Sequence, residues 1–417
     1  MLQSMRRILR LFDPELPPKV WLVQLGVFIN FLGNGMVAPF LVIYLHFGRG
    51  IPLGLAGSAV ALGGITAVTS GLVAGSLADR IGPRNILVAA MISNAAAYLL
   101  YTQVTLPWQA FAVGLMVGFG TGCYGPSSQN LLASLVPAEK RQAAFAQNRV
   151  TSVVGLGAGG AIGGIIASAG LSGYLHLLVL DAVTFLSFAA LMLLLPSTRT
   201  ATAVGSHGGY VAVTRDRAFL WLVAVNIAMV AAGIAPMLVL LPAFAKIQTH
   251  VGEAAIGAIY ALNTLTIVAA QLPLTKLTAA LPRMLILRGA AGLWIVSWLV
   301  CLAAGASLRA GAAIVVIAMA VVVYALGECL YSSVMLPTAI ALAPAELRGR
   351  YLGAMGLAWQ SGFLIGPSAG SAILGAAPLA LPAFCAAVCV VAALGMGLVD
   401  RNLAPALRQG AMAVANT

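Results

Sequence analysis

The fold of this chain is decided by a stretch of sequence that occurs twice. Residues 120–164 read GTGCYGPSSQNLLASLVPAEKRQAAFAQNRVTSVVGLGAGGAIGG, and residues 327–371 read GECLYSSVMLPTAIALAPAELRGRYLGAMGLAWQSGFLIGPSAGS. The matching positions include Gly120 with Gly327, Tyr124 with Tyr331, Pro137-Ala138-Glu139 with Pro344-Ala345-Glu346, Arg141 with Arg348, and Gly155, Gly159 and Gly163 with Gly362, Gly366 and Gly370. Each copy is predicted to form a helix, a basic loop and a glycine-rich helix. The chain therefore contains two repeats of one unit.

The composition is that of a membrane protein. Of the 417 residues, 61% are hydrophobic and only 8% are charged, whereas a soluble domain carries about a quarter charged residues. A membrane-spanning helix needs roughly 20 apolar residues. Backbone groups in lipid must be satisfied within the segment, so each apolar run is predicted to be helical. Twelve such runs occur, at about 19–46, 51–78, 85–104, 108–136, 149–170, 173–195, 217–243, 254–280, 283–304, 310–340, 350–376 and 378–399.

The basic residues predict the orientation of these helices. With both termini in the cytoplasm, only Arg49, Lys246 and Arg309 of the 22 Lys and Arg lie outside, as the positive-inside rule requires. The basic residues form no dense patch with aromatics, which argues against nucleic acid as a partner. The expected organisation is a cytoplasmic basic tail at 1–18, six-helix bundles at 19–195 and 217–399, a cytoplasmic linker at 196–216 and a cytoplasmic tail at 400–417.

The repeat favours a carrier over other membrane proteins. Parallel repeats of this kind build transporters whose two halves rock around a site at the membrane midplane. A receptor or a channel would not require them, although neither is excluded by the repeat. An ATP-driven pump is disfavoured, because the sequence has no Gly-Lys-Ser/Thr phosphate loop.

The loop after the second apolar run carries a family motif. Residues 75–84, Gly-Ser-Leu-Ala-Asp-Arg-Ile-Gly-Pro-Arg, resemble the signature of the major facilitator superfamily, with Pro83 as a departure from the usual arginine. The resemblance implies an all-α integral membrane protein of twelve transmembrane helices in two pseudo-symmetric six-helix bundles. It also implies a latch on the cytoplasmic side, built from Gly75, Asp79, Arg80, Gly82 and Arg84. The alternative is that these charges only set the topology.

Glycines recur in the fifth and eleventh helices. Residues 155–164 resemble the antiporter signature of drug exporters, but Gly160 stands where that signature has proline. The matching segment of the second repeat does carry Gly366-Pro367. We expect helix packing at Gly155, Gly159, Gly163, Gly362, Gly366, Pro367 and Gly370, since small residues let helices approach closely in lipid. The arginine that proton antiporters often carry in the fourth helix is missing.

Two acids lie well inside the apolar runs. A charge in the membrane is costly and therefore marks a functional site by default, which makes Glu328 and Asp181 the candidates for proton coupling. Glu328 shares a helical face with Tyr324 and Tyr331, at spacings of four and three residues. The alternative is that each acid is paired for structural reasons.

In the family, the first, fourth, seventh and tenth helices line a central cavity. The resemblance therefore implies a substrate cavity lined by Asn30, Asn34, Ser127, Ser128, Asn226, Met229, Tyr324, Glu328 and Tyr331. A mostly apolar cavity with one acid suits amphipathic or cationic compounds better than sugars. Some of these residues could instead form hydrogen bonds between helices.

We therefore interpret the chain as a proton-coupled exporter of lipophilic or amphipathic small molecules, resembling the drug:proton antiporter branch. An exporter of an endogenous metabolite, lipid-like compound or siderophore is the alternative. We expect no enzyme activity, no cofactor and no metal, because no nucleophile with a base and no metal-ligand cluster converges within the apolar runs. The expected partners are a small-molecule substrate, protons and the lipid bilayer. The expected state is a monomer in a bacterial inner membrane.

Overall fold

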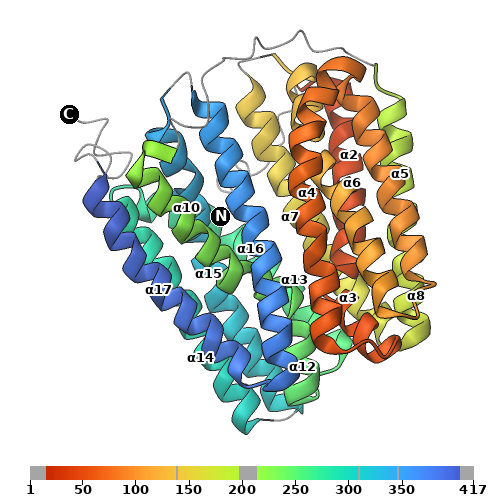
Figure 1. Ribbon diagram of the computed structural model, residues 1–417, viewed down its shortest axis with the longest axis vertical. Helices are drawn as coiled ribbons and strands as arrows, with labels where there is room; N and C mark the ends of the chain where they lie inside the picture. Colours follow the sequence, from red (N-terminus) through yellow and green to blue (C-terminus); the bar gives the residue numbers. More distant parts are fainter. Residues whose placement is uncertain (1–15, 138–139, 197–213, 309, 345–346, 404–417) are drawn as a thin grey trace, which may run out of the picture. The chain divides into compact units, whose positions relative to one another are not determined.

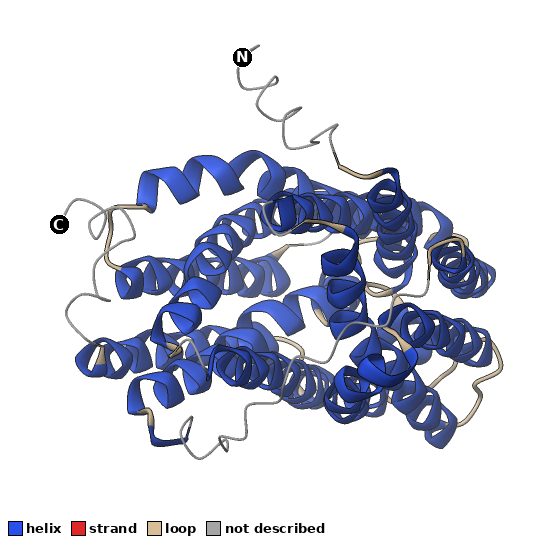
Figure 2. Cartoon of the chain, turned by 90° about the horizontal axis from the view of Figure 1, so that it is seen from above, coloured by secondary structure: helices blue, strands red, loops and turns tan. Residues whose placement is uncertain are grey.

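The computed structural model describes residues 16–137, 140–196, 214–308, 310–344 and 347–403. Within those ranges the chain is helical and contains no strand, and short loops join the helices (Figure 2). The chain divides into two compact units. The first contains the residues up to Ile51 together with Leu62–Ala203, and the second contains Pro52–Ala61 together with Val204–Thr417.

The first unit contains the helices coloured red to yellow-green in Figure 1. Its opening span covers Pro18 to Gly48. A turn at residues 38–40 separates α2 from α3, and a wider turn, η1, ends the span. The elements are α2 (Pro18–Val37), α3 (Leu41–Ile43), η1 (Tyr44–Gly48), α4 (Leu53–Ile81, whose residues up to Ala61 belong to the second unit), α5 (Pro83–Tyr101), α6 (Pro107–Leu135), α7 (Arg141–Ala167) and α8 (Leu171–Leu193).

The second unit contains the helices coloured green to blue. Its first span also contains a wider turn, η3, which here lies between two α-helical segments. The elements are α10 (Arg217–Met229), η3 (Val230–Ile234), α11 (Ala235–Val239), α12 (Leu241–Thr249), α13 (Glu253–Thr278), α14 (Arg283–Ser307), α15 (Ala310–Leu342), α16 (Arg348–Ala376) and α17 (Ala380–Asn402).

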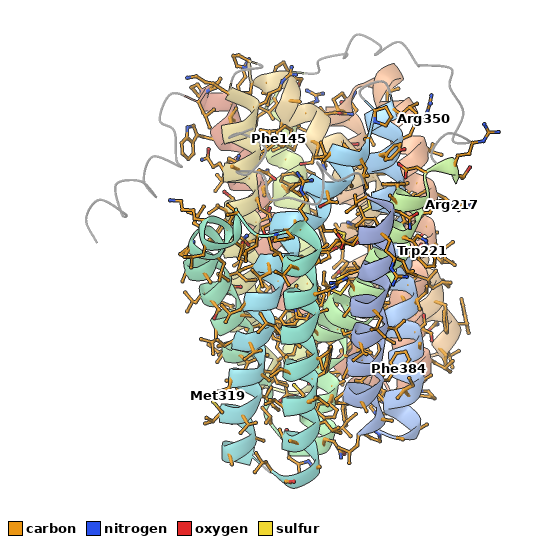
Figure 3. All side chains as sticks on the ribbon, turned by 90° about the vertical axis from the view of Figure 1, so that its left-hand side faces the viewer. Phe145, Arg217, Trp221, Met319, Arg350 and Phe384 are labelled. Atoms are coloured by element: carbon orange, nitrogen blue, oxygen red, sulfur yellow. The ribbon has the colours of Figure 1, made fainter. Side chains whose placement is uncertain are left out.

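The structure confirms the predicted fold class. Nine segments of the described chain are long and apolar enough to cross a membrane, and α5, α6 and α16 are not among the nine. Large apolar side chains are exposed, including Leu277 (77%), Leu394 (73%) and Val391 (65%). Met319 and Trp221 likewise lie on the outside of the second unit (Figure 3). Exposure of so much apolar surface is costly in water and natural in lipid.

Backbone contact between glycine-rich helices organises each unit. In the first unit, a Cβ added at Gly159 of α7 would lie 2.0 Å from the Leu32 carbonyl oxygen of α2, and one at Gly163 would lie 2.5 Å from that of Met36. In the second unit, a Cβ at Gly366 of α16 would lie 2.4 Å from the carbonyl oxygen of Ala231 in η3. The repeated glycines thus bring the fifth helix of each unit against the first.

Candidate functional site

Glu328 lies on α15 among aromatic side chains of the second unit. The residue is half-buried, and its carboxylate lies close enough to Tyr324 and Tyr331 for its charge to act on both phenols. Both tyrosines are buried, with 3% and 6% of their surface exposed. The face predicted from the sequence spacing therefore exists, and the acid is its most exposed member.

A tryptophan from α14 completes this aromatic group. The ring of Trp294 stacks on that of Tyr324 with centroids 5.5 Å apart and an interplanar angle of 19°, and its centroid lies 5.5 Å from that of Tyr331. Its Nε1 donates a hydrogen bond to the Tyr324 carbonyl oxygen, at 3.1 Å. Glycine at 233 and 327 makes room for the indole, because a Cβ there would lie 2.1 Å and 2.6 Å from its atoms.

The same cluster is tied to α10. The Tyr331 hydroxyl donates to Asn226 Oδ1 at 2.5 Å, and both residues are buried. Met229, one turn further along α10, is fully buried. Asn226 thus fixes the orientation of Tyr331, and Met229 belongs to the packed interior of the unit.

The first unit holds the second acid. Asp181 of α8 is fully buried, accepts a hydrogen bond from Thr184 Oγ1 at 2.9 Å, and has no partner for Oδ2 among the described residues. The backbone of α2 passes directly over it, since a Cβ at Gly33 would lie 2.1 Å from Asp181 Oδ1. The carboxyl group is therefore enclosed between α2 and α8.

The predicted cavity residues of the first unit are mostly buried as well. The Tyr124 hydroxyl hydrogen-bonds with both Asn30 and Ser128, which links α2 to α6. The Oδ1 atom of Asn30 and the Oγ atom of Ser127 are buried without a partner in the described structure. Asn34 is half-buried. The two hydrogen bonds of Tyr124 therefore lie within one unit, one between helices and one within α6.

The loop between α4 and α5 is described in part. Gly75, Asp79 and Arg80 lie in α4, and the side chains of Asp79 and Arg80 fall outside the described residues. Gly82 has a φ of 88°, a conformation that glycine adopts without strain, and α5 begins directly after it. Arg84 donates from Nη1 to the Leu195 carbonyl oxygen, at 2.6 Å, just beyond the end of α8. Arg84 therefore binds the end of a helix in its own unit.

Sequence reasoning missed Trp294 and a polar contact between α13 and α15. Gln271 Nε2 donates to the Cys329 carbonyl oxygen, and Ser332 Oγ donates to Gln271 Oε1. The signal that could have found Trp294 is Gly327, one residue before the acid, because a glycine there leaves room for a large neighbour. Nothing in the sequence identifies Trp294 itself as that neighbour.

Comparison with known protein families identifies one that matches most of the chain. The family model of the Major Facilitator Superfamily matches residues 23–367. The MFS-type transporter YhjO of Bacillus subtilis is 24% identical over 84% of each chain, and YttB of the same species is 31% identical over 42% of this chain. The multidrug resistance protein MdtG of Dickeya zeae is 30% identical over 32% of each chain. The chain covers only 43% of the length of YttB and 27% of that of a Na⁺, Li⁺, K⁺/H⁺ antiporter of Planococcus maritimus.

Solved structures show the same fold. A point mutant of the nucleoside transporter NupG superposes with a TM-score of 0.77 at 13% identity, covering 91% of this chain and 99% of the other. A peptide transporter of the POT family in complex with sulfate gives a TM-score of 0.76 at 15% identity, covering 94% and 96%. At such identities the likeness concerns the fold alone.

Proposed function

Because the chain belongs to the Major Facilitator Superfamily and is therefore a secondary transporter, we propose that it exports lipophilic or amphipathic small molecules in exchange for protons, by alternating access. The names of several relatives support this choice. They include a multidrug resistance protein, a multidrug efflux pump homolog and an antiporter that exchanges alkali cations for protons.

The observation that carries the proposal is the position of Glu328 within an aromatic group. The acid is half-buried, and two phenols and an indole surround that face of α15. Aromatic rings attract cations through their negative faces, most strongly where water is excluded. A carboxylate beside such rings supplies the opposite charge. A lipophilic cation is the class of substrate that this chemistry fits.

Exchange follows from competition for one carboxylate. A proton and a cationic substrate cannot both neutralise Glu328, so binding of one releases the other. If each binds from the opposite side of the membrane, outward movement of the cation is coupled to inward movement of the proton. Asp181 is the second candidate for the proton, since it is enclosed with one carboxyl oxygen unpartnered in the described structure and lies inside a span.

We further propose that the protein acts as a monomer in a bacterial inner membrane, with both termini in the cytoplasm. The distribution of basic residues supports this orientation. The relatives from Bacillus and Dickeya support a bacterial setting.

Replacement of Glu328 tests the coupling. In proteoliposomes with an imposed pH gradient, Glu328→Gln should reduce accumulation of a lipophilic cation such as tetraphenylphosphonium at least about tenfold, because glutamine keeps the size of the side chain but cannot ionise. Glu253→Gln is the matched control. Glu253 lies at the start of α13 in the same unit and forms an ion pair with Lys246. Its replacement should leave accumulation close to the wild-type level.

The control separates coupling from a general loss of charge. Wild-type accumulation by Glu328→Gln would remove Glu328 from the mechanism and make Asp181 the leading candidate. An equal loss in both variants would show that the effect reflects charge or stability, and would likewise contradict the assigned role.

A further inference from the structure

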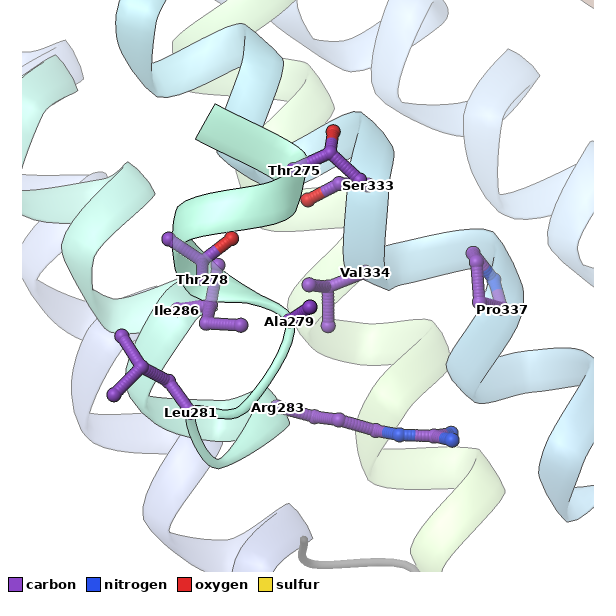
Figure 4. Close-up of a pocket in the computed structure, with 9 residues that line it drawn as sticks. All are labelled: Thr275, Thr278, Ala279, Leu281, Arg283, Ile286, Ser333, Val334 and Pro337. Atoms are coloured by element: carbon purple, nitrogen blue, oxygen red, sulfur yellow. The ribbon is translucent and has the colours of Figure 1, made fainter. Parts of the chain in front are cut away.

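A pocket opens at one end of the second unit, where α13 ends and α14 begins beside α15 (Figure 4). Its volume is about 130 Å³, whereas a single water needs only about 10–15 Å³. The wall combines the hydroxyl-bearing Thr275, Thr278 and Ser333 with apolar side chains and one cation, Arg283. The pocket is therefore large enough for a group of several heavy atoms.

Arg283 is the cationic donor of the pocket. Its side chain extends beneath Val334 in Figure 4, and Nη1 is buried with no hydrogen-bond partner among the residues that the structure describes. The three hydroxyls already donate within their own helices, to the carbonyl oxygens of Gln271, Leu274 and Leu330. A buried guanidinium nitrogen without an acceptor is costly. The described residues that line the pocket thus include one cation and no anion.

The first unit shows how the matching arginine is satisfied. A Pro-Arg pair begins the third helix of each half, at Pro83-Arg84 and at Pro282-Arg283. Arg84 donates to the Leu195 carbonyl oxygen, so its guanidinium has an acceptor within its own unit. Arg283 lines the pocket, and its Nη1 has no acceptor among the described residues. The two halves therefore differ at this position, and the second arginine is free to meet a group from outside the chain through Nη1.

The surroundings of the pocket indicate which kind of molecule would supply an acceptor for Arg283. Four leucines of the same helix ends are exposed, namely Leu277, Leu281, Leu285 and Leu336, at 77%, 41%, 51% and 50%. Such side chains face lipid tails in a membrane protein, and arginine binds phosphate oxygens in a bidentate manner. We propose that this pocket binds the headgroup phosphate of an anionic phospholipid, with Arg283 as its ligand and the exposed leucines along its acyl chains.

Lipid binding by the full-length chain in detergent tests the proposal. Native mass spectrometry would measure the dissociation constant of the most tightly bound molecule of dioctanoyl-phosphatidylglycerol. Arg283→Gln should weaken it at least about tenfold, which corresponds to about 1.4 kcal/mol. Ala279→Leu, which fills the pocket and keeps the arginine, should weaken it similarly. Lys276→Gln removes an exposed charge from the same helix end without touching the pocket, and should leave binding unchanged.

Two further probes distinguish the source of the phosphate. Inorganic phosphate and dioctanoylglycerol, which has the acyl chains but no phosphate, should both bind far more weakly than the phospholipid. Inorganic phosphate that binds as tightly would assign the pocket to a soluble anion, and dioctanoylglycerol that binds as tightly would remove the role of the arginine. Both outcomes overturn the proposal, as does unchanged lipid binding in Arg283→Gln. If Arg283→Gln fails to fold by circular dichroism, Ala279→Leu decides the question.

Discussion

Trp294 is the residue that orders the aromatic face around Glu328. It is fully buried, stacks on Tyr324 and donates to the carbonyl oxygen of the same residue. A second tryptophan of α14, Trp298, is equally buried and donates from Nε1 to the Ala232 carbonyl oxygen, at 2.9 Å. The two side chains make similar hydrogen bonds, but only Trp294 touches the tyrosines beside the acid. This difference supplies a matched pair of variants.

Replacement by phenylalanine should separate the two tryptophans. Trp294→Phe and Trp298→Phe each remove one buried hydrogen bond, so each should lower the free energy of unfolding by about 1–3 kcal/mol. Only Trp294→Phe should also weaken binding of a lipophilic cation, by about two- to tenfold, because it removes the hydrogen bond that holds the ring against Tyr324, and such a bond contributes about 0.5–1.5 kcal/mol. Thermal unfolding and equilibrium binding of tetraphenylphosphonium measure the two effects. Equal binding by both variants would contradict a role for Trp294 in positioning the site.

The sequence predicted the face of α15 but not what packs against it. The spacing of Tyr324, Glu328 and Tyr331 depends only on the geometry of one helix, and could therefore be read directly. The contact with Trp294 joins residues about thirty positions apart in the chain and depends on how α14 crosses α15. Periodicity within one segment contains no information about such a crossing.

At the scale of elements, most predicted and observed helices agree within a few residues, although α7 begins at Arg141 and not at the predicted residue 149. The apolar run predicted at 283–304 is the helix Arg283–Ser307, and that at 108–136 is Pro107–Leu135. Length and hydrophobicity suffice for this agreement, because the bilayer sets the length of each span. The wider turns η1 and η3 were not predicted. Pro236 lies two residues after η3, and since proline has no N–H, the carbonyl oxygen of Ala232 accepts a hydrogen bond from Trp298 instead.

The glycines of α7 give a prediction about helix packing. Gly159→Ala should lower the unfolding temperature, because its Cβ would lie 2.0 Å from the Leu32 carbonyl oxygen and force α7 away from α2. Gly125→Ala, in α6 of the same unit, adds a Cβ with nothing within 4 Å. It should be neutral or stabilising, since alanine is favoured over glycine in a helix by about 1 kcal/mol. Thermal unfolding in detergent compares the two, and a Gly159→Ala protein at least as stable as Gly125→Ala would refute close packing as the role of this glycine.

At the scale of the whole molecule, charge marks one end of the helices. A basic residue near a helix N-terminus opposes the helix dipole, so its repeated presence there requires another reason. The positive-inside rule supplies one. Arg217 and Arg350, at the starts of α10 and α16, lie at one end of the second unit, and Met319 lies toward the other (Figure 3). Every second span has a basic residue at or near its first position, namely Lys19, Arg84, Arg141, Arg217, Arg283 and Arg348.

This pattern predicts the topology, which single cysteines can test. Arg141→Cys, at the start of α7, should react with a membrane-impermeant maleimide only after cells are permeabilised, because that end should be cytoplasmic. Gln103→Cys, between α5 and α6, should react in intact cells. Both positions are exposed, so a difference in labelling reports the side of the membrane. All five native cysteines are buried and should give little background. Labelling of Arg141→Cys in intact cells would contradict the proposed orientation with both termini in the cytoplasm.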